Sequence, residues 1–98
     1  MSLPLIIRPE AEQDIADAQR WYERERPGLG NEFLLGVEEA RDRVRSTPHL
    51  YAIVYRGLRA CPIPKFSYIL YYKVDPDHLE VVAVVHSRRD ASAWKSRA

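Results

Sequence analysis

The period of the apolar residues changes at Pro48, and this change constrains the fold more than any other feature of the sequence. Before Pro48 the apolar residues recur every three or four positions, which is typical of amphipathic helices. After Pro48 the chain is rich in strand-forming residues such as Val, Ile and Tyr. A helical half followed by a strand half predicts an α+β domain, with helices packed on one face of a sheet.

Length and composition set further bounds. The 98 residues suffice for one modest core, so residues 1–98 are expected to form a single domain. The sequence has no apolar run long enough to span a membrane, and its N-terminus does not resemble a signal peptide. A lone cysteine, Cys61, leaves no internal disulfide, which makes the cytoplasm the expected compartment.

The first half predicts a short strand and two helices. The strand covers residues 3–8, and Pro9 suits the first turn of a helix, where its missing N–H costs no hydrogen bond. Two apolar stripes at helical spacing follow, separated by Pro27 and Gly28: Ala11, Ile15, Ala18 and Tyr22, then Phe33, Val37, Ala40 and Val44. Two helices joined by so short a turn should pack as an antiparallel hairpin.

The second half predicts a three-stranded antiparallel meander. Its strands are expected at 52–61, with an interruption near Gly57, at 66–74 and at 79–86. Pairing of the last two across the turn at 75–78 would place Lys73 opposite Glu80, a favourable cross-strand pair. Residues 91–98 are expected to form a short helical turn or a frayed tail.

Side-chain alternation along these strands assigns residues to two faces. The face expected to take the helices holds Phe66, Tyr68, Leu70, Tyr72, Val81, Ala83 and Val85. The opposite face holds Ser67, Ile69, Tyr71, Lys73, Glu80, Val82, Val84, His86 and Arg88. Since only two main helices are predicted, this second face is expected to stay open and to bind partners.

Charge is distributed unevenly along the chain. Residues 1–48 carry seven arginines and ten acidic residues, a net charge of −3. Residues 49–98 carry eight basic and four acidic residues, a net charge of +4. The second half is therefore the expected place for an anionic partner, although solvated arginines on an ordinary sheet would give the same composition.

Several side chains on or near the second face could carry chemistry. Arginines could hold phosphates or stabilise developing charge, a histidine could move a proton near neutral pH, and an aromatic ring could stack on a base. The candidate binding residues are Arg59, Lys65, Tyr71, His86, Arg88, Arg89 and Trp94. For Trp94, packing on the sheet is the stronger interpretation. The acidic residues of the first helix are expected to be a solvated face: Glu10, Asp14 and Asp17. The spacing of the histidines and the cysteine predicts no metal site, and no cofactor is expected.

The chain resembles the RelE/ParE superfamily of bacterial toxin–antitoxin toxins, and most of all the branch of plasmid-stabilisation proteins. The resemblance covers essentially the whole chain. It rests on AEQDIADAQRWYERERPGLGNEFL in the helical half, and on YRGLRACPIPKFSYILYYKV and VVAVVHSRRDASAW in the strand half. It implies a small toxin that a cognate antitoxin neutralises in a hetero-oligomer, with no membrane involved.

Two activities occur in that superfamily. RelE-like members cleave mRNA on the ribosome without a metal, and ParE-like members inhibit DNA gyrase by binding it. Comparison of this sequence, position by position, with RelE-type enzymes favours the ParE-like activity. Ile69 stands where RelE-type enzymes have a catalytic arginine, and Trp94 stands where they have a tyrosine, although Arg88 matches the arginine after the last strand. Ala60 and Pro62 lie near the positions of lysines on the second strand.

The leading interpretation is therefore a ParE-like inhibitor of gyrase rather than an enzyme. The alternative is a ribosome-dependent endoribonuclease that would use Arg88, His86 and Arg59 as catalytic residues. A third possibility is a relative that has kept the fold and lost toxicity.

Overall fold

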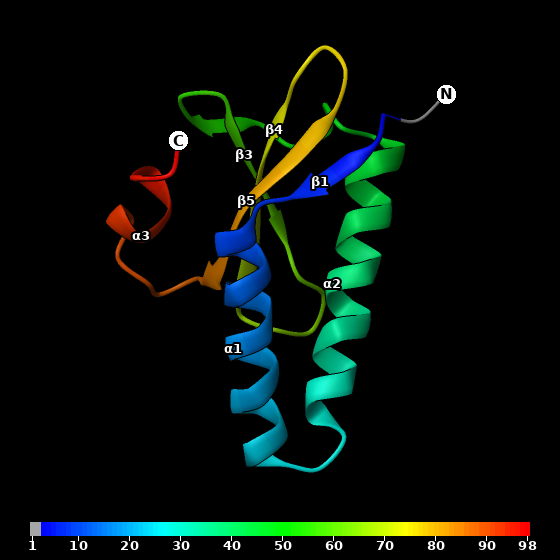
Figure 1. The fold of residues 1–98 in the computed structure, drawn as a ribbon, viewed down its shortest axis with the longest axis vertical. Helices are drawn as coiled ribbons and strands as arrows, with labels where there is room; N and C mark the ends of the chain where they lie inside the picture. The colour runs from blue at the N-terminus through cyan, green and yellow to red at the C-terminus, as the bar shows by residue number, and fades with distance from the viewer. Residues whose placement is uncertain (1–2) are drawn as a thin grey trace.

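Within residues 3–98, which the computed structural model describes, five strands form one sheet in the order β1-β5-β4-β3-β2 (Figure 1). Strand β1 runs parallel to β5, and the other neighbours are antiparallel. In chain order the elements are β1 (Leu5–Ile7), α1 (Pro9–Glu25), α2 (Leu29–Ser46), β2 (Ile53–Tyr55), β3 (Leu58–Pro62), β4 (Tyr68–Val74), β5 (Leu79–His86) and α3 (Ser92–Lys95). The predicted α+β fold is confirmed.

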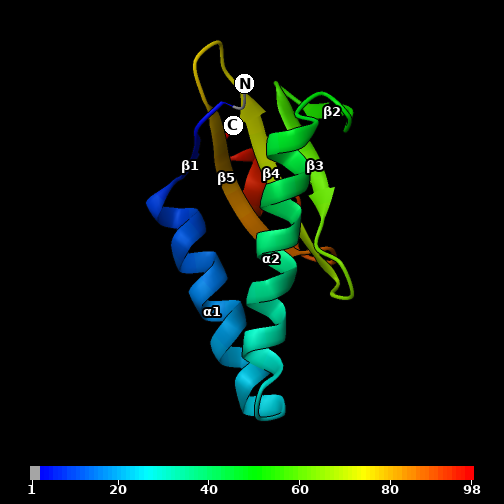
Figure 2. The same ribbon diagram turned by 90° about the vertical axis from the view of Figure 1, so that its right-hand side faces the viewer.

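The two long helices form the predicted antiparallel hairpin and cover one face of the sheet (Figure 2). Gly28 turns the chain between them with a positive φ of 89°, a conformation that glycine adopts without strain. The Glu23 carboxylate accepts hydrogen bonds from the Gly28 and Gly30 backbone N–H groups, each at 3.0 Å. Glu23 at the end of α1 therefore satisfies N–H groups at the start of α2, which helix geometry leaves without partners.

The segment predicted as one interrupted strand, 52–61, is instead two strands. Arg56 and Gly57 both have positive φ, 42° and 81°, and they form a tight turn between β2 and β3. A two-residue turn with both φ values positive matches the right-handed twist of the strands that it joins. The meander therefore has four antiparallel strands rather than three.

The pairing of β4 with β5 begins as predicted and then shifts. Val74 lies opposite Leu79 and Lys73 opposite Glu80, as expected. Tyr72 then pairs with Val81, whereas Tyr71 pairs with Ala83, so Val82 is an extra residue in β5. Such a β-bulge reverses the alternation of side chains beyond it.

Because of the bulge, the faces predicted for the second half of β5 are wrong. Ala83 and Val85, expected under the helices, lie on the opposite face in a cluster with Tyr71. Val84, expected on the open face, belongs to the core under the helices. His86 lies opposite Tyr68 and faces α1. The assignments for β4 are confirmed, because the core under the helices includes Leu70 and Tyr72 and the opposite cluster includes Tyr71 and Ile69.

The second face of the sheet is covered by α3, so the prediction that it stays open is wrong. The Trp94 ring stacks on the Tyr71 ring, with centroids 4.2 Å apart and an interplanar angle of 11°. Tyr71 keeps only 6% of its surface exposed. The packing interpretation of Trp94 is the one that this geometry favours.

The C-terminal end of the chain is tied to the bulge rather than frayed. The Arg97 guanidinium donates to both Asp14 carboxylate oxygens, at 2.6 and 3.2 Å, and to the Val82 carbonyl at 3.2 Å. Asp14 also accepts the Val84 backbone N–H at 3.0 Å, and Arg8 donates to the Arg97 carbonyl at 2.8 Å. We call Asp14, Arg97 and the Val82 and Val84 backbone groups the Asp14 cluster. Asp14 is thus not part of a solvated face, whereas Glu10 and Asp17 are exposed as expected.

Tyr72 is a fully buried side chain whose hydroxyl donates to the Pro48 carbonyl at 2.7 Å. Tyr72→Phe should lower the free energy of unfolding by about 1 kcal/mol at neutral pH, measured by urea denaturation. Burial raises the pKa of Tyr72 from 10.0 to about 12. Because the pKa is higher in the folded than in the unfolded state, the free energy of unfolding is unaffected by this group below pH 10. It falls as the pH rises from 10 towards 12. The variant should lack this part of the alkaline loss, and an unchanged alkaline profile would contradict the assignment.

His78 sits in the turn between β4 and β5, with Nδ1 2.8 Å from Asp77 Oδ1 and Nε2 3.2 Å from Asp75 Oδ2. The hydrogen bond to Asp77 raises the pKa of His78 above its ordinary 6.5, and the same bond lowers the pKa of Asp77. An NMR titration should therefore give a midpoint above 6.5 for His78, and Asp77→Asn should move it down. Because the pKa of His78 is raised in the folded state, the stability that its protonated form contributes is fully present below pH 6.5. This contribution is lost as the pH rises through the folded-state pKa. A midpoint that ignores Asp77→Asn would contradict this geometry.

Candidate functional site

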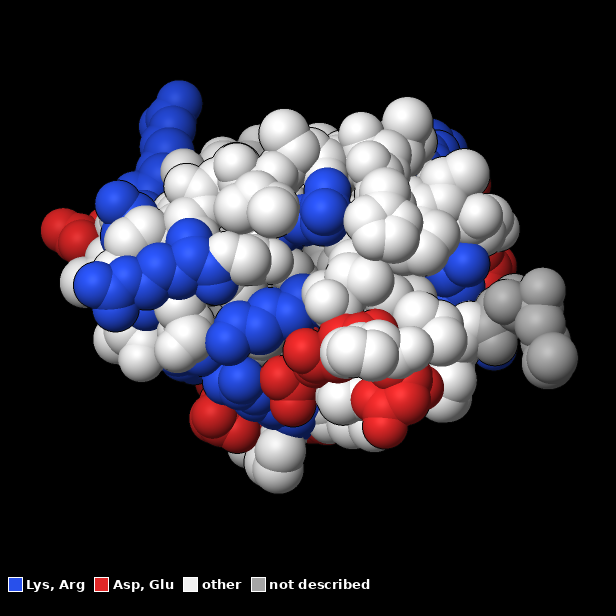
Figure 3. All heavy atoms as spheres, turned by 90° about the horizontal axis from the view of Figure 1, so that it is seen from above, with Lys and Arg blue, Asp and Glu red and all other residues white. Residues whose placement is uncertain are grey.

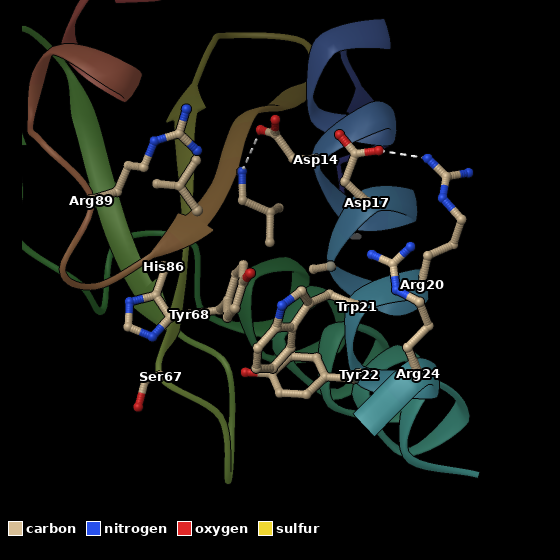
Figure 4. Close-up of a pocket in the computed structure, with 13 residues that line it drawn as sticks. Asp14, Asp17, Arg20, Trp21, Tyr22, Arg24, Ser67, Tyr68, His86 and Arg89 are labelled. Carbon is tan, nitrogen blue, oxygen red and sulfur yellow. Dashed lines mark hydrogen bonds and ion pairs between the residues drawn. The ribbon is translucent and has the colours of Figure 1, made fainter. Parts of the chain in front are cut away.

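A pocket of about 760 Å³ opens between α1 and the adjoining ends of β4 and β5 (Figure 4). This volume is within the range of sites that bind ligands or side chains of a partner. We call it the α1 pocket. Helix α1 contributes Asp14, Asp17, Ala18, Arg20, Trp21, Tyr22 and Arg24, and the sheet side contributes Ser67, Tyr68, Val84, Val85, His86 and Arg89.

Aromatic rings form one side of the α1 pocket. The Tyr22 ring stacks on the buried Phe33 at a centroid distance of 5.3 Å and meets Tyr68 edge-on at 5.8 Å. Trp21 packs edge-on against Tyr22 at 5.1 Å, yet half of its surface is exposed. Burial raises the pKa of both tyrosines, so their hydroxyls stay neutral at physiological pH. The side is therefore apolar and held in place by the core behind it.

The charged groups of the α1 pocket are only partly compensated. Asp17 is paired with Arg20 at 2.6 Å, and Asp14 is engaged by Arg97. Among residues 3–98, Arg24 and Arg89 form no ion pair. The pocket therefore keeps an excess of positive charge.

The wider surface is also uneven in charge. Figure 3 shows Lys and Arg side chains gathered mainly on the side of the molecule that carries α3. This distribution agrees with the positive net charge of residues 49–98.

The tautomer of His86 follows from its local hydrogen bond. The Arg88 backbone N–H donates to His86 Nδ1 at 3.1 Å. Because a backbone N–H can only donate, Nδ1 is the acceptor and the neutral ring carries its proton on Nε2. The ring lies edge-on to Tyr68, with centroids 5.3 Å apart. In this arrangement His86 can donate a hydrogen bond into the pocket, but it has no free ring nitrogen with which to act as a base.

The structure brings together only two of the seven predicted binding residues, His86 and Arg89, which both line the α1 pocket. Tyr71 and Trp94 are packed together under α3. The Arg59 guanidinium donates to the Tyr51 carbonyl at 2.6 Å.

The two remaining predicted residues lie elsewhere. Lys65 lines a smaller groove beside α2. The Arg88 side chain is exposed on the loop after β5.

The three predicted catalytic residues do not form one site. Arg59 lies opposite Tyr72 and His86 lies opposite Tyr68, four residues apart along β4. Four residues of strand span about 13 Å, and Arg59 and His86 lie two strands apart, which adds about 10 Å across the sheet. With its guanidinium held by Tyr51, Arg59 cannot reach a substrate that touches His86.

The residues contributed by α1 were not among the predicted site residues. The sequence pattern predicts binding residues only on or near the sheet. It predicts that α1 has one face packed in the core and one face exposed to solvent. One signal was available, because Trp21 stands next to the apolar stripe rather than on it and is flanked by Arg20 and Arg24. A large aromatic residue between cations on a helix surface is typical of a binding site.

Within residues 3–98, no three His, Cys, Asp or Glu side chains are grouped so that they could hold a metal ion. Over the same residues, no helix is both long and apolar enough to cross a membrane.

Comparison with solved structures shows a known fold. The structure is similar to one described as "Chromosomal ParDE TA system from P. aeruginosa", with a TM-score of 0.77 and 11% sequence identity. The match covers 87% of this chain and 96% of that chain. A search of curated proteins by sequence finds no match.

Sequence comparison then gives the family. Residues 5–91 match the family described as the ParE toxin of the type II toxin–antitoxin system, parDE. The chain therefore belongs to the ParE toxin family, and the predicted relation to RelE/ParE toxins is confirmed.

Proposed function

We propose that this protein is the toxin of a type II toxin–antitoxin pair, that it inhibits DNA gyrase by binding to it, and that a cognate antitoxin neutralises it in a hetero-oligomer. Membership of the ParE toxin family supports the toxin role. The shared fold with the structure described as a chromosomal ParDE TA system supports an antitoxin partner. Both partners would be met in the cytoplasm.

The observation that favours inhibition by binding over RNA cleavage is the separation of Arg59 from His86. A metal-free ribonuclease needs a base, an acid and a cation around one phosphate, within hydrogen-bond reach of the reacting atoms. Here His86 Nδ1 accepts a backbone N–H, Arg59 is held on β3, and Trp94 is stacked on Tyr71. The residues assigned to the RelE-type alternative are therefore dispersed, because Arg59 lies on β3, two strands away from His86, and Arg88 is exposed on the loop after β5.

The test is a supercoiling assay with purified protein, gyrase, ATP and relaxed plasmid, run beside an mRNA cleavage assay on translating ribosomes. Loss of supercoiling with intact mRNA is the expected result. Cleaved mRNA with normal supercoiling would overturn the gyrase proposal. If the soluble protein affects neither assay, the toxin proposal fails and a non-toxic relative is indicated.

Arg88→Ala separates the two activities further. For an inhibitor that binds over a broad surface, Arg88 is one exposed contact, and its loss should weaken inhibition by less than tenfold. In a ribonuclease, losing the cation that stabilises the transition state would cost roughly 3–4 kcal/mol, or more than a hundredfold in rate. Inhibition constants and cleavage rates of wild type and variant provide the comparison.

A further inference from the structure

We infer that the β2 edge of the sheet is a surface that binds the phosphate backbone of double-stranded DNA. We call this surface the basic rim. Its exposed cations come from three places: Arg43 and Arg45 in the last turn of α2, Arg56 in the turn after β2, and Lys95 in α3. The inference goes beyond the proposed function and does not depend on it, because the contact is with DNA itself and needs no gyrase.

The positive charge of the strand half is not neutralised within the chain. Residues 43–74 contain six Lys or Arg and no Asp or Glu. The four acidic residues that follow are held by other groups: Asp75 and Asp77 by His78, Glu80 by Arg8, and Asp90 by the Ser92 backbone N–H. Among residues 3–98, no Lys or Arg from position 43 to position 95 therefore forms an ion pair.

The helical half behaves differently. Of its five arginines before position 43, four form an ion pair: Arg8, Arg20, Arg26 and Arg41. Unpaired cations are thus concentrated in the strand half rather than scattered over the chain. An incoming anion would gain ion pairs there without displacing any that exist.

Tyr51 joins the α2 end of the basic rim to the sheet. The Tyr51 side chain lies beside Arg43, and the Tyr51 carbonyl accepts a hydrogen bond from the Arg59 guanidinium at 2.6 Å. Arg59 in turn lies opposite Ile53 of β2. The end of α2 and strand β2 therefore belong to one continuous surface.

Tyr55 joins the other end of the basic rim to α3. The Arg56 guanidinium carbon lies 5.2 Å from the centre of the Tyr55 ring, and Lys95 Nζ lies 5.0 Å from the same centre. Figure 3 shows Lys and Arg side chains gathered on the side of the molecule that carries α3. The cations thus extend from α2 past β2 to α3, as contacts with an elongated polyanion require.

The rings beside these cations are covered, which favours a duplex over a single strand. Arg56 and Lys95 lie against Tyr55, and Trp94 is stacked on Tyr71. Binding of single-stranded nucleic acid depends on exposed rings on which bases can stack. A duplex keeps its bases inside and presents phosphates, about one negative charge per 1.7 Å of helix axis. Cations spread over three elements can meet several of these phosphates at once.

The experiment is a titration of short, fluorescently labelled DNA duplexes of several sequences with the full chain, followed by anisotropy over a series of NaCl concentrations. Affinity should vary little with sequence, because backbone contacts carry no sequence information. Four phosphate contacts should give a plot of log K against log salt with a slope of roughly −4.

Two double variants test the two ends of the basic rim. Arg43→Gln/Arg45→Gln and Arg56→Gln/Lys95→Gln should each weaken DNA binding at low salt by about tenfold or more. Each should also reduce the magnitude of the salt slope by about 2, since each removes two phosphate contacts. A merely structural role for these residues would leave the slope unchanged.

The matched control is Arg26→Gln/Lys65→Gln. It removes the same charge from two exposed cations outside the basic rim, at the turn between the helices and in the groove beside α2. This variant should bind DNA as wild type does, with the same salt slope. Thermal unfolding of every variant establishes that it is folded before its binding is compared.

Three results would overturn the inference. One is a soluble, folded protein that binds no duplex at low salt, and another is equal binding by the rim variants and the control variant. The third is tighter binding of single-stranded RNA, or of polyglutamate, than of duplex DNA at the same concentration of negative charge. DNA binding is measured without gyrase, so failure of the gyrase proposal and failure of the basic rim are distinguished.

Discussion

Asp14→Ala should lower the free energy of unfolding by about 2–3 kcal/mol, because it removes the centre of the Asp14 cluster. The substitution leaves the Val84 N–H without its acceptor and the Arg97 guanidinium without its carboxylate. The Asp14 and Arg97 side chains are mostly buried, with 15% and 24% of their surfaces exposed, so solvent cannot fully replace the lost bonds. For a domain of this size the melting temperature should fall by about 10–20 °C.

Asp17→Ala is the matched control for this prediction. Asp17 lies on the same helix and forms a 2.6 Å ion pair with Arg20, but both side chains are more than half exposed. Exposed pairs contribute little, so unfolding free energy should change by less than about 1 kcal/mol. Equal effects of the two substitutions, measured by urea denaturation, would show that the cluster is not a structural centre.

Trp94→Ala should also destabilise the protein strongly, by about 2–3 kcal/mol. The indole covers Tyr71, Ala83 and Val85, and its loss would expose an apolar sheet face to water. Trp94→Phe keeps a ring on Tyr71 and should restore more than half of the lost stability. Denaturation curves of the two variants beside wild type measure these differences.

The other tryptophan separates packing from function. Trp21→Ala removes a half-exposed ring and should cost less than about 1 kcal/mol, while it should weaken inhibition per folded molecule, because Trp21 lines the α1 pocket. For Trp94→Ala the reverse is expected, with reduced stability and normal inhibition per folded molecule. A Trp94→Ala protein that is as stable as wild type but inactive would reinstate Trp94 as a functional residue.

Much of the fold was predictable because the relevant signals are local. The helical spacing from Ala11 to Tyr22 and the proline and glycine that follow define α1 and its end. The charge pair of Lys73 and Glu80 gave the correct register at the β4–β5 turn. Alternation along β4 placed Leu70 and Tyr72 correctly, because β4 is paired without a shift of register on the β3 side and the charged Lys73 indicates the face away from the core.

The bulge in β5 was not predictable from the same kind of signal. Residues 81–85 read Val-Val-Ala-Val-Val, so either face could be buried with almost no change in apolar area. The choice is made by distant groups, because Arg97 bonds the Val82 carbonyl and Asp14 bonds the Val84 N–H. These partners come from the segment after α3 and from α1, outside β5 in the sequence.

The candidate site shows the same division. His86 and Arg89 were identified from the strand end that carries them, but their partners in the pocket, Trp21 and Arg24, are contributed by α1. Sequence reasoning could also not distinguish an open sheet face from one covered by a helix as short as α3. The sequence by itself determined the helices, most of the strands and the family. Only the tertiary structure decided which way β5 faces and where the pocket lies, because both depend on contacts between segments remote in the chain.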